Sequence, residues 1–243
     1  MSFPHHSPKR ALVTGASQGI GLAVALKLAA EGFEVALVAR SEPALQEAVD
    51  QIHQAGGSAQ AFAIDLADPN RVPGQLVTLL QTFGSCSLLI NNAGMGYTST
   101  IADTPAADWR RVLDLNLTAA FLTIQAVLPG MRQQLEGLII NVVSIAGKQV
   151  FPTWGAYSAS KFGLMALTQA VAQEERQHGI RASAFCPGAV NTSLWDTPTV
   201  QANFDRSLML TVNEVADALL QLVRMPSSTV VDEMVLMPAA GAL

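Results

Sequence analysis

The chain has 243 residues, of which 50% are hydrophobic and 14% charged, enough apolar material for one sizeable core. A net charge of −5 without a basic cluster argues against a nucleic-acid partner. No apolar run approaches the ~20 residues of a membrane span, and Cys86 and Cys186 lack framework spacing, so we expect a cytoplasmic protein with reduced thiols and no membrane partner.

Apolar strand-like runs alternate with helical patterns from end to end, which is typical of βαβ units around a parallel sheet. The predicted strands are 11–14, 34–39, 59–64, 88–91, 138–143, 181–186 and 233–237. Helices are predicted to begin near Gly19, Ser41, Pro69, Pro105, Ala156 and Asn213. No linker-like composition divides the chain, so we expect residues 1–243 to form a single α/β domain.

A glycine-rich loop lies between the first predicted strand and the first predicted helix. Glycines permit a tight turn and let a pyrophosphate approach the backbone, while the N–H groups at the helix start face the anion. The strand before the loop and the helix after it meet the context test for a dinucleotide fingerprint. We therefore expect a cofactor-binding loop at Gly15, Ser17, Gln18, Gly19, Ile20 and Gly21.

The end of the second strand bears on the choice between NAD and NADP. A carboxylate there would bind the ribose hydroxyls and repel a 2′-phosphate. This chain has Ala39 and then Arg40, whose guanidinium offers a planar set of donors to a phosphate. The sequence favours NADP(H), and the alternative is that Arg40 is a solvated surface residue.

Four polar residues in the second half of the chain suggest proton transfer. Tyr157 and Lys161 lie four apart, on one face of a predicted helix, where a cation favours the phenolate and lowers the phenol pKa. Ser144 follows an apolar strand, so its hydroxyl should emerge at the carboxyl end, where open α/β sheets bind ligands. Asn116 falls within a predicted long helix.

Together these motifs resemble the cofactor loop and catalytic set of the short-chain dehydrogenase/reductase family, over about residues 9–238. The resemblance implies a Rossmann fold with a doubly wound, seven-stranded parallel sheet, NADP(H) as cofactor, and reversible reduction of ketones or aldehydes. Tyr157 would be the general acid, Lys161 would lower its pKa and bind the nicotinamide ribose, and Ser144 would donate to the substrate oxygen. Asn116 would hold a water that links Lys161 to solvent.

The resemblance also assigns cofactor contacts at the other strand ends. Asp65 would accept a bond from the adenine amino group, beside Leu66, and the alternative for Asp65 is a simple helix-start aspartate. NADP-dependent relatives often carry a basic residue where this chain has Gln18, so one phosphate contact is missing. The adenosine side would be lined by Asn92, Ala93 and Gly94, and the nicotinamide carboxamide would be held by Pro187, Gly188, Val190 and Thr192.

The segment 190–210 interrupts the alternation of strands and helices, and a loop of this length inside a compact domain is typically functional. The resemblance implies a substrate lid, and the alternative is an amphipathic connector. The residues expected around the pocket are mostly apolar or aromatic, and Lys148 has no evident acidic partner. This composition favours a neutral ketone or aldehyde. The expected lining comprises Met95, Gly96, Tyr97, residues 145–154, Trp195 and Phe204.

The leading interpretation is an NADPH-dependent carbonyl reductase. A 3-oxoacyl-[acyl-carrier-protein] reductase is the alternative, and it is disfavoured by the scattered Arg132, Arg176 and Arg181, because an acidic carrier needs a basic rim. A non-catalytic NADP-binding protein is the third hypothesis, although Tyr157 and Lys161 are both present. The histidines lack metal-ligand spacing, and Ser144 lacks a nucleophile elbow.

The resemblance implies a homotetramer built on two long helices, 105–134 and 156–177. The second helix carries a stripe of small residues that would let a partner helix approach closely. Packing against the chain's own sheet is the alternative explanation of that stripe, which comprises Ala159, Gly163, Ala166 and Ala170.

Overall fold

The computed structural model describes residues 9–202 and 204–241, which include a seven-stranded sheet in the order β3-β2-β1-β4-β5-β6-β7. All neighbouring strands pair in parallel, which confirms the predicted fold class. Every strand begins and ends within one residue of its predicted position. The strands are β1 (Arg10–Thr14), β2 (Glu34–Ala39), β3 (Ser58–Ala63), β4 (Leu88–Asn91), β5 (Gly137–Val142), β6 (Ile180–Pro187) and β7 (Glu233–Leu236).

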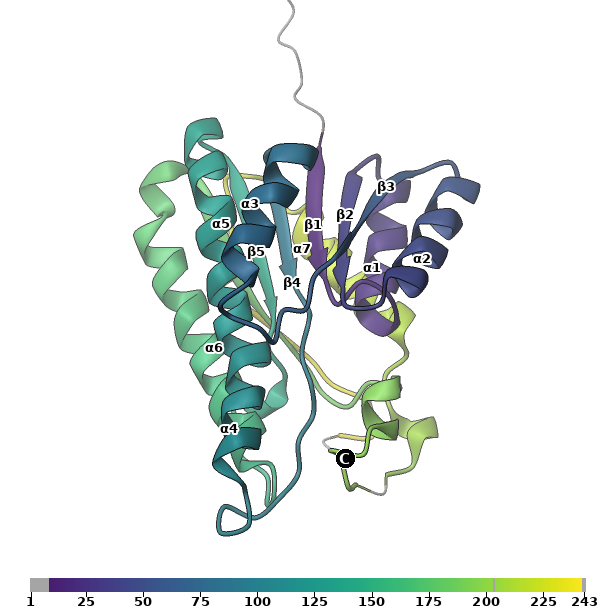
Figure 1. Cartoon of the computed structure of the whole chain (residues 1–243), viewed down its shortest axis with the longest axis vertical. Helices are drawn as coiled ribbons and strands as arrows, with labels where there is room; N and C mark the ends of the chain where they lie inside the picture. The colour runs from purple at the N-terminus through teal and green to yellow at the C-terminus, as the bar shows by residue number, and fades with distance from the viewer. Residues whose placement is uncertain (1–8, 203, 242–243) are drawn as a thin grey trace, which may run out of the picture.

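Helices cover both faces of the sheet, because successive strand residues point to opposite sides. Val13 packs under α1, α2 and α7, whereas Leu12 packs under α3, α5 and α6. Figure 1 shows these helices around the sheet and the 190–210 segment (green) beyond the strand ends. The helices are α1 (Gly19–Ala30), α2 (Glu42–Gln54), α3 (Val72–Phe83), α4 (Ala106–Leu113), α5 (Ala119–Gln134), α6 (Gly155–Glu174) and α7 (Val212–Arg224).

A π-helical turn, Asp114–Thr118, joins α4 to α5 without a break. The resulting stretch Ala106–Gln134 has 29 residues and a mean hydropathy of 1.5, so by length and composition it could cross a membrane. The helix reaches this value as an average, because polar residues such as Asn116, Thr123 and Gln125 interrupt its apolar runs. Ile124, Val127 and Met131 of α5 are buried against the sheet, as in a core helix, which passes the same test.

Four buried polar side chains connect the central strands to the helices of one face. The Asn91 amide of β4 donates to Asn141 Oδ1 of β5 at 2.9 Å. The Thr123 hydroxyl of α5 donates to Asn91 Oδ1 at 2.6 Å, and the Asn141 amide donates to the Thr168 hydroxyl of α6 at 2.8 Å. Because a buried polar atom without a partner is destabilising, this network fixes how α5 and α6 sit on the sheet.

We expect Asn141→Leu to lower the free energy of unfolding by about 2–4 kcal/mol, because it removes the acceptor of Asn91 and the donor to Thr168. Urea denaturation measures this change. Asn213→Leu is the matched control, since Asn213 is exposed on α7, and should change the value by less than about 0.5 kcal/mol. Equal effects of the two substitutions would contradict the role of the network.

Candidate functional site

A cavity of about 1280 Å³ lies at the carboxyl ends of the strands. Of the predicted site residues, Gly21, Asp65 and Asn116 do not line it. The predicted residues that do are Gly15, Ser17, Gln18, Gly19, Ile20, Arg40, Leu66, Asn92, Ala93, Gly94, Ser144, Tyr157, Lys161, Pro187, Gly188, Val190 and Thr192. The fold therefore brings together residues that are far apart in the sequence.

The glycine-rich loop is held firmly between β1 and the segment after β4. The Thr14 hydroxyl accepts the N–H groups of Asn92 and Ala93, each at 3.0 Å, and the Asn92 amide donates to the Thr14 carbonyl at 3.1 Å. A Cβ at Gly21 would lie 2.2 Å from the Gly15 carbonyl oxygen, so no side chain fits there. The first turn of α1 thus faces the cavity with N–H groups that have no partners within the helix, a suitable site for a pyrophosphate.

The charged side chains on the described cavity wall are Arg40, Arg111 and Lys161, without a carboxylate among them. This one-sided charge favours an anionic ligand such as a dinucleotide. Arg40 is exposed, and no ion pair links it to another described residue. Asp65 instead uses its carboxylate to accept the Ala67 N–H at 3.1 Å, and its role in adenine binding stays a prediction.

Ser144 follows β5 with a φ of 135°, a left-handed conformation that costs a non-glycine residue about 1–3 kcal/mol. Its Oγ accepts the N–H of Ala146 at 3.1 Å. Since an acceptor position of the oxygen is used in this way, the hydroxyl hydrogen is left to donate on the cavity side, where the phenol of Tyr157 lies. The strained backbone therefore presents a hydrogen-bond donor at the end of the strand.

Lys161 lies on α6 one turn after Tyr157, and its ammonium is 5.7 Å from the centre of the Tyr157 ring. The Nζ donates to the Val142 carbonyl at 3.0 Å, and burial lowers the pKa of Lys161 to about 8. Burial also raises the pKa of Tyr157, and a hydrogen bond with Ser144 opposes this rise only in part.

The expectation that the Tyr157 pKa is lowered by Lys161 was therefore wrong for this structure. Desolvation of the phenol outweighs the hydrogen bond with Ser144, and the Lys161 ammonium donates its hydrogen bond to the Val142 carbonyl instead. Consequently, Tyr157 keeps its proton at neutral pH, which is the form that a proton donor requires.

Asn116 is buried in the π-helical turn and connects two parts of the site. Its Oδ1 accepts the Met95 N–H at 2.8 Å, and its amide donates to the Met95 carbonyl at 3.0 Å and to Ser160 Oγ at 3.1 Å. Isolated π turns are frequent at functional sites. Here the side chain ties the segment after β4 to α6, one residue from Lys161.

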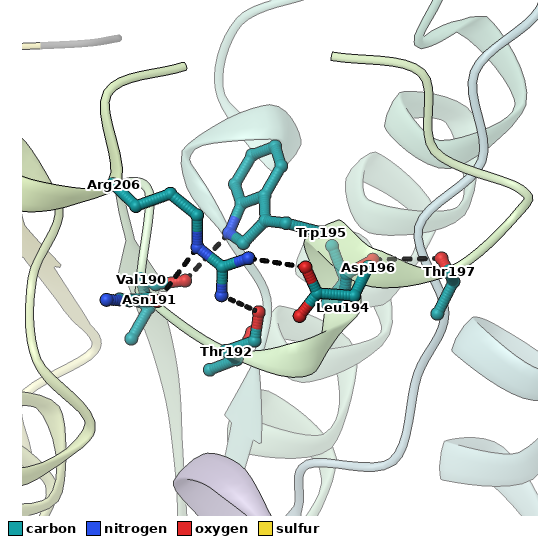
Figure 2. Close-up of polar contacts among 8 residues, drawn as sticks. All are labelled: Val190, Asn191, Thr192, Leu194, Trp195, Asp196, Thr197 and Arg206. Carbon is teal, nitrogen blue, oxygen red and sulfur yellow. Dashed lines mark hydrogen bonds and ion pairs between the residues drawn. The ribbon is translucent and has the colours of Figure 1, made fainter. Parts of the chain in front are cut away.

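The described residues 190–202 and 204–210, hereafter the lid segment, include a group of side chains and carbonyls that surround the guanidinium of Arg206 (Figure 2). Arg206 Nε donates to Asn191 Oδ1 at 2.9 Å, and its Nη groups donate to the Asp196 carboxylate at 2.6 Å and the Thr192 carbonyl at 2.7 Å. The sequence did not single out Arg206, because its partners lie 10 to 15 residues away in an aperiodic stretch.

The other side of the lid segment is bonded to the chain after β4. The Thr98 N–H donates to the Thr199 carbonyl at 2.9 Å, and the Thr199 hydroxyl donates to the Gly96 carbonyl at 2.8 Å. A Cβ on Gly96 would lie 2.6 Å from a Val200 methyl group, so this close packing requires glycine. The lid segment therefore borders the cavity from the β6 side to the β4 side.

Sequence reasoning missed two further features of the site. Lys148 was expected to have no acidic partner, but it forms an ion pair with Glu233 of β7, a residue 85 positions away. Arg111 and Leu115 also line the cavity, although only their helical spacing in the sequence hinted at a shared face.

The model of the short chain dehydrogenase family matches residues 9–202. A 3-oxoacyl-[acyl-carrier-protein] reductase of Synechocystis sp. (strain ATCC 27184 / PCC 6803 / Kazusa) is 40% identical over 185 residues, covering 76% of this chain and 75% of the relative. A metagenomic short-chain oxidoreductase in complex with NADP has a TM-score of 0.83 at 33% identity, over 96% and 98% of the two chains. An alcohol dehydrogenase from the archaeon Thermococcus sibiricus, complexed with 5-hydroxy-NADP, has a TM-score of 0.88 at 26% identity, over 97% and 98%.

We expect Arg206→Leu to increase the rate of chymotrypsin cleavage within the lid segment by about tenfold, because losing charge-assisted bonds raises the open population. Limited proteolysis with mass analysis of the fragments measures this rate. Arg224→Leu is the control, since it breaks the Arg224–Glu31 ion pair on α7 and α1 and should leave lid cleavage unchanged. Cleavage of the Arg206 variant at the wild-type rate would refute the clamp.

Proposed function

The chain belongs to the short-chain dehydrogenase/reductase family of oxidoreductases, and we propose that it reduces the carbonyl group of ketones or aldehydes with NADPH. The observation that carries this proposal is the placement of Ser144, Tyr157 and Lys161 on the wall of a cavity that also contains the glycine-rich loop. In the proposal the whole chain acts as one cofactor-binding and catalytic domain, with 190–210 as its lid.

NADPH supplies the hydride when it is bound, and the protein orients it and excludes water. The free N–H groups of the loop would hold the pyrophosphate, Arg40 the 2′-phosphate, and Lys161 the nicotinamide ribose. The absence of any carboxylate from the described cavity wall fits this anionic ligand. The solved structures bound to NADP and 5-hydroxy-NADP support the same choice of cofactor.

Tyr157 then gives its proton to the substrate oxygen, and its raised pKa keeps that proton available at neutral pH. The Ser144 hydroxyl donates a hydrogen bond to the same oxygen as negative charge builds there. The ammonium of Lys161 stabilises the tyrosinate that remains. These roles favour carbonyl reduction over alcohol oxidation at neutral pH.

Asn116 is proposed to position Lys161 and to hold the water of the proton relay. Its side-chain amide is engaged with Met95 and Ser160, so a bound water would use its backbone carbonyl. The wide π turn at Asp114–Thr118 alters the helical bonding there, which is consistent with a carbonyl free to bind water.

A 3-oxoacyl-[acyl-carrier-protein] reductase is the second candidate, favoured by the similarity to the Synechocystis enzyme. The basic rim that an acidic carrier protein requires is weak in this chain. Arg132 is paired with Glu175, and Arg181 donates to the carbonyls of Pro226 and Thr229. These arginines are thus already engaged within the chain. A non-catalytic NADP-binding protein is the third hypothesis, and the NADPH oxidation assay described below tests it.

We also propose a homotetramer in the cytoplasm. Ala159, Ala166 and Ala170 are exposed on α6, on its outer side and away from the sheet, and Phe121 and Phe162 expose 45% and 42% of their surface nearby on α5 and α6. Small and aromatic residues on outward faces of these helices support helix packing between subunits.

The burial of Cys86 and Cys186 as free thiols agrees with a reducing compartment.

We expect the wild-type protein to oxidise NADPH with simple ketones, faster than NADH, and Tyr157→Phe to lose about 10²–10⁴-fold in rate because it lacks the proton donor. The decay of NADPH absorbance with aliphatic, aromatic and acetoacetyl-thioester ketones measures these rates.

Arg40→Ala is the accompanying variant in this assay. It should raise the KM for NADPH about tenfold and leave that for NADH unchanged, because only NADPH carries the 2′-phosphate. If NADPH were oxidised with the acetoacetyl thioester and not with the simple ketones, the 3-oxoacyl-[acyl-carrier-protein] reductase hypothesis would be favoured. NADPH binding without turnover of any substrate would support the non-catalytic hypothesis.

We expect kcat/KM for NADPH, which reports groups of the free enzyme, to be level below pH 8 and about tenfold lower at pH 9. Burial lowers the pKa of Lys161 to about 8, so the ammonium that holds the cofactor and stabilises the tyrosinate is lost above that pH. The raised pKa of Tyr157 keeps the phenol protonated over the same range. Stopped-flow assays from pH 6 to pH 9.5 measure this pH profile. The control variant Lys161→Met should give a kcat/KM that is low and does not change with pH. A wild-type kcat/KM maintained to pH 9.5 would contradict the prediction.

A further inference from the structure

Three aromatic side chains continue from Tyr157 across the substrate end of the cavity. The ring centres of Tyr157 and Trp154 are 5.3 Å apart, those of Trp154 and Trp195 are 5.9 Å apart, and those of Trp195 and Phe204 are 5.3 Å apart. Each pair meets edge to face, with interplanar angles between 68° and 84°. All four rings line the cavity, so they form one aromatic wall leading away from the proton donor.

The position of this wall fixes which part of a substrate would touch it. A carbonyl oxygen that receives the proton of Tyr157 must lie beside the phenol hydroxyl. Trp154 is three residues before Tyr157 and contacts its ring, so a substituent on the carbonyl carbon is directed against Trp154. Beyond it lie Trp195 and Phe204, which belong to the lid segment.

The described residues beside the aromatic wall offer burial from apolar side chains. Met95, Ile145 and Leu194 are apolar, and the hydroxyl of Thr199 is already committed to the Gly96 carbonyl. Lys148 is paired with Glu233, and it does not line the cavity. The charged residues of the described cavity wall are Arg40, Arg111 and Lys161, and none of them belongs to the aromatic wall. A carboxylate or phosphate lying against these rings would therefore lose its hydration without an ion pair from the aromatic wall itself.

The aromatic wall is also held in place before any substrate arrives. The Trp195 indole donates to the Val190 carbonyl at 2.8 Å, and Arg206 bonds the Thr192 carbonyl before it and the Asp196 carboxylate after it (Figure 2). The backbone of Trp154 immediately precedes α6 and forms a β-bridge with Ser99. Rings that are already ordered lose little freedom on binding, so more of their contact energy appears as affinity.

We propose that Trp154, Trp195 and Phe204 form an aryl-binding subsite, and that neutral ketones with an aromatic ring on the carbonyl carbon are the preferred substrates. The inference rests on the proposed carbonyl reduction and names the substrate class of that same site. An aromatic ring fits this wall better than a saturated ring of equal size, because its positive edge and negative face match the faces and edges of the indoles.

Acetophenone and cyclohexyl methyl ketone make the matched pair for the test, since they share the same carbon skeleton and differ in the aromaticity of the ring, and the change of their ratio between variants removes the effect of conjugation on the carbonyl. The wild-type protein should reduce acetophenone with a kcat/KM about 2- to 10-fold higher, the effect of an aromatic contact. Trp195→Leu should bring this ratio close to one, whereas Trp195→Phe should keep most of it. Trp109→Phe is the control, because Trp109 lies on α4 outside the cavity and the ratio should not change.

Binding of the same two ketones to the protein saturated with NADP⁺, followed by ligand-observed NMR, gives a readout that does not depend on turnover. Tighter binding of acetophenone to wild type, lost in Trp195→Leu, would support the subsite. Equal kcat/KM and equal affinity for both ketones in wild type would overturn the subsite while leaving carbonyl reduction intact. If neither ketone were reduced, the proposed function would fail, and the ratio of affinities would still decide whether the aryl subsite exists.

Discussion

The buried hydrogen bond between the side chains of Asn91 and Asn141 is the interaction on which the arrangement of the site depends. Each amide has a second partner on a helix, Thr123 of α5 and Thr168 of α6. An apolar interface would tolerate small sliding of these helices, but amides buried in the sheet must meet their hydroxyl partners at fixed positions. Since α6 carries Tyr157 and Lys161 further toward its start, the network also sets where the two meet the end of β5.

The electrostatics of the site follow from the same burial. Lys161 is buried with a carbonyl as its hydrogen-bond partner, so its charge is poorly solvated and its pKa falls to about 8. Tyr157 is desolvated as well, and its pKa rises. The two shifts move the pKa values of ammonium and phenol apart, so the phenol holds its proton more firmly than the ammonium does, and neither group has a counter-charge on the described cavity wall. An anionic ligand placed beside Lys161 would supply that counter-charge, which couples cofactor binding to the protonation of the catalytic pair.

The sequence was sufficient for those parts of the molecule that depend on local rules. Buried parallel strands are short apolar runs, which is why the five inner strands were located within one residue, and the less buried edge strands β3 and β7 were located as closely. The placement of the glycine loop and of Ser144 at strand ends followed in the same way. The partner of Lys148 and the clamp of Arg206 could not be predicted, because both depend on how distant segments meet. The Tyr157 pKa was predicted with the wrong sign because solvation is a property of the folded site and not of residue spacing.

The two sides of the lid segment are held by interactions of unequal strength. Near β6, the guanidinium of Arg206 bonds a carboxylate, an amide and a carbonyl, and charge-assisted bonds of this kind are about twice as strong as neutral ones. Near β4, only neutral bonds join Thr98 and Gly96 to Thr199. Opening therefore costs least between residues 96–98 and 197–201, with the Arg206 side acting as the fixed end. In the proposed function, a lid that opens there would expose the aromatic wall before the cofactor loop, so the substrate would enter and the product would leave while the dinucleotide stays in place.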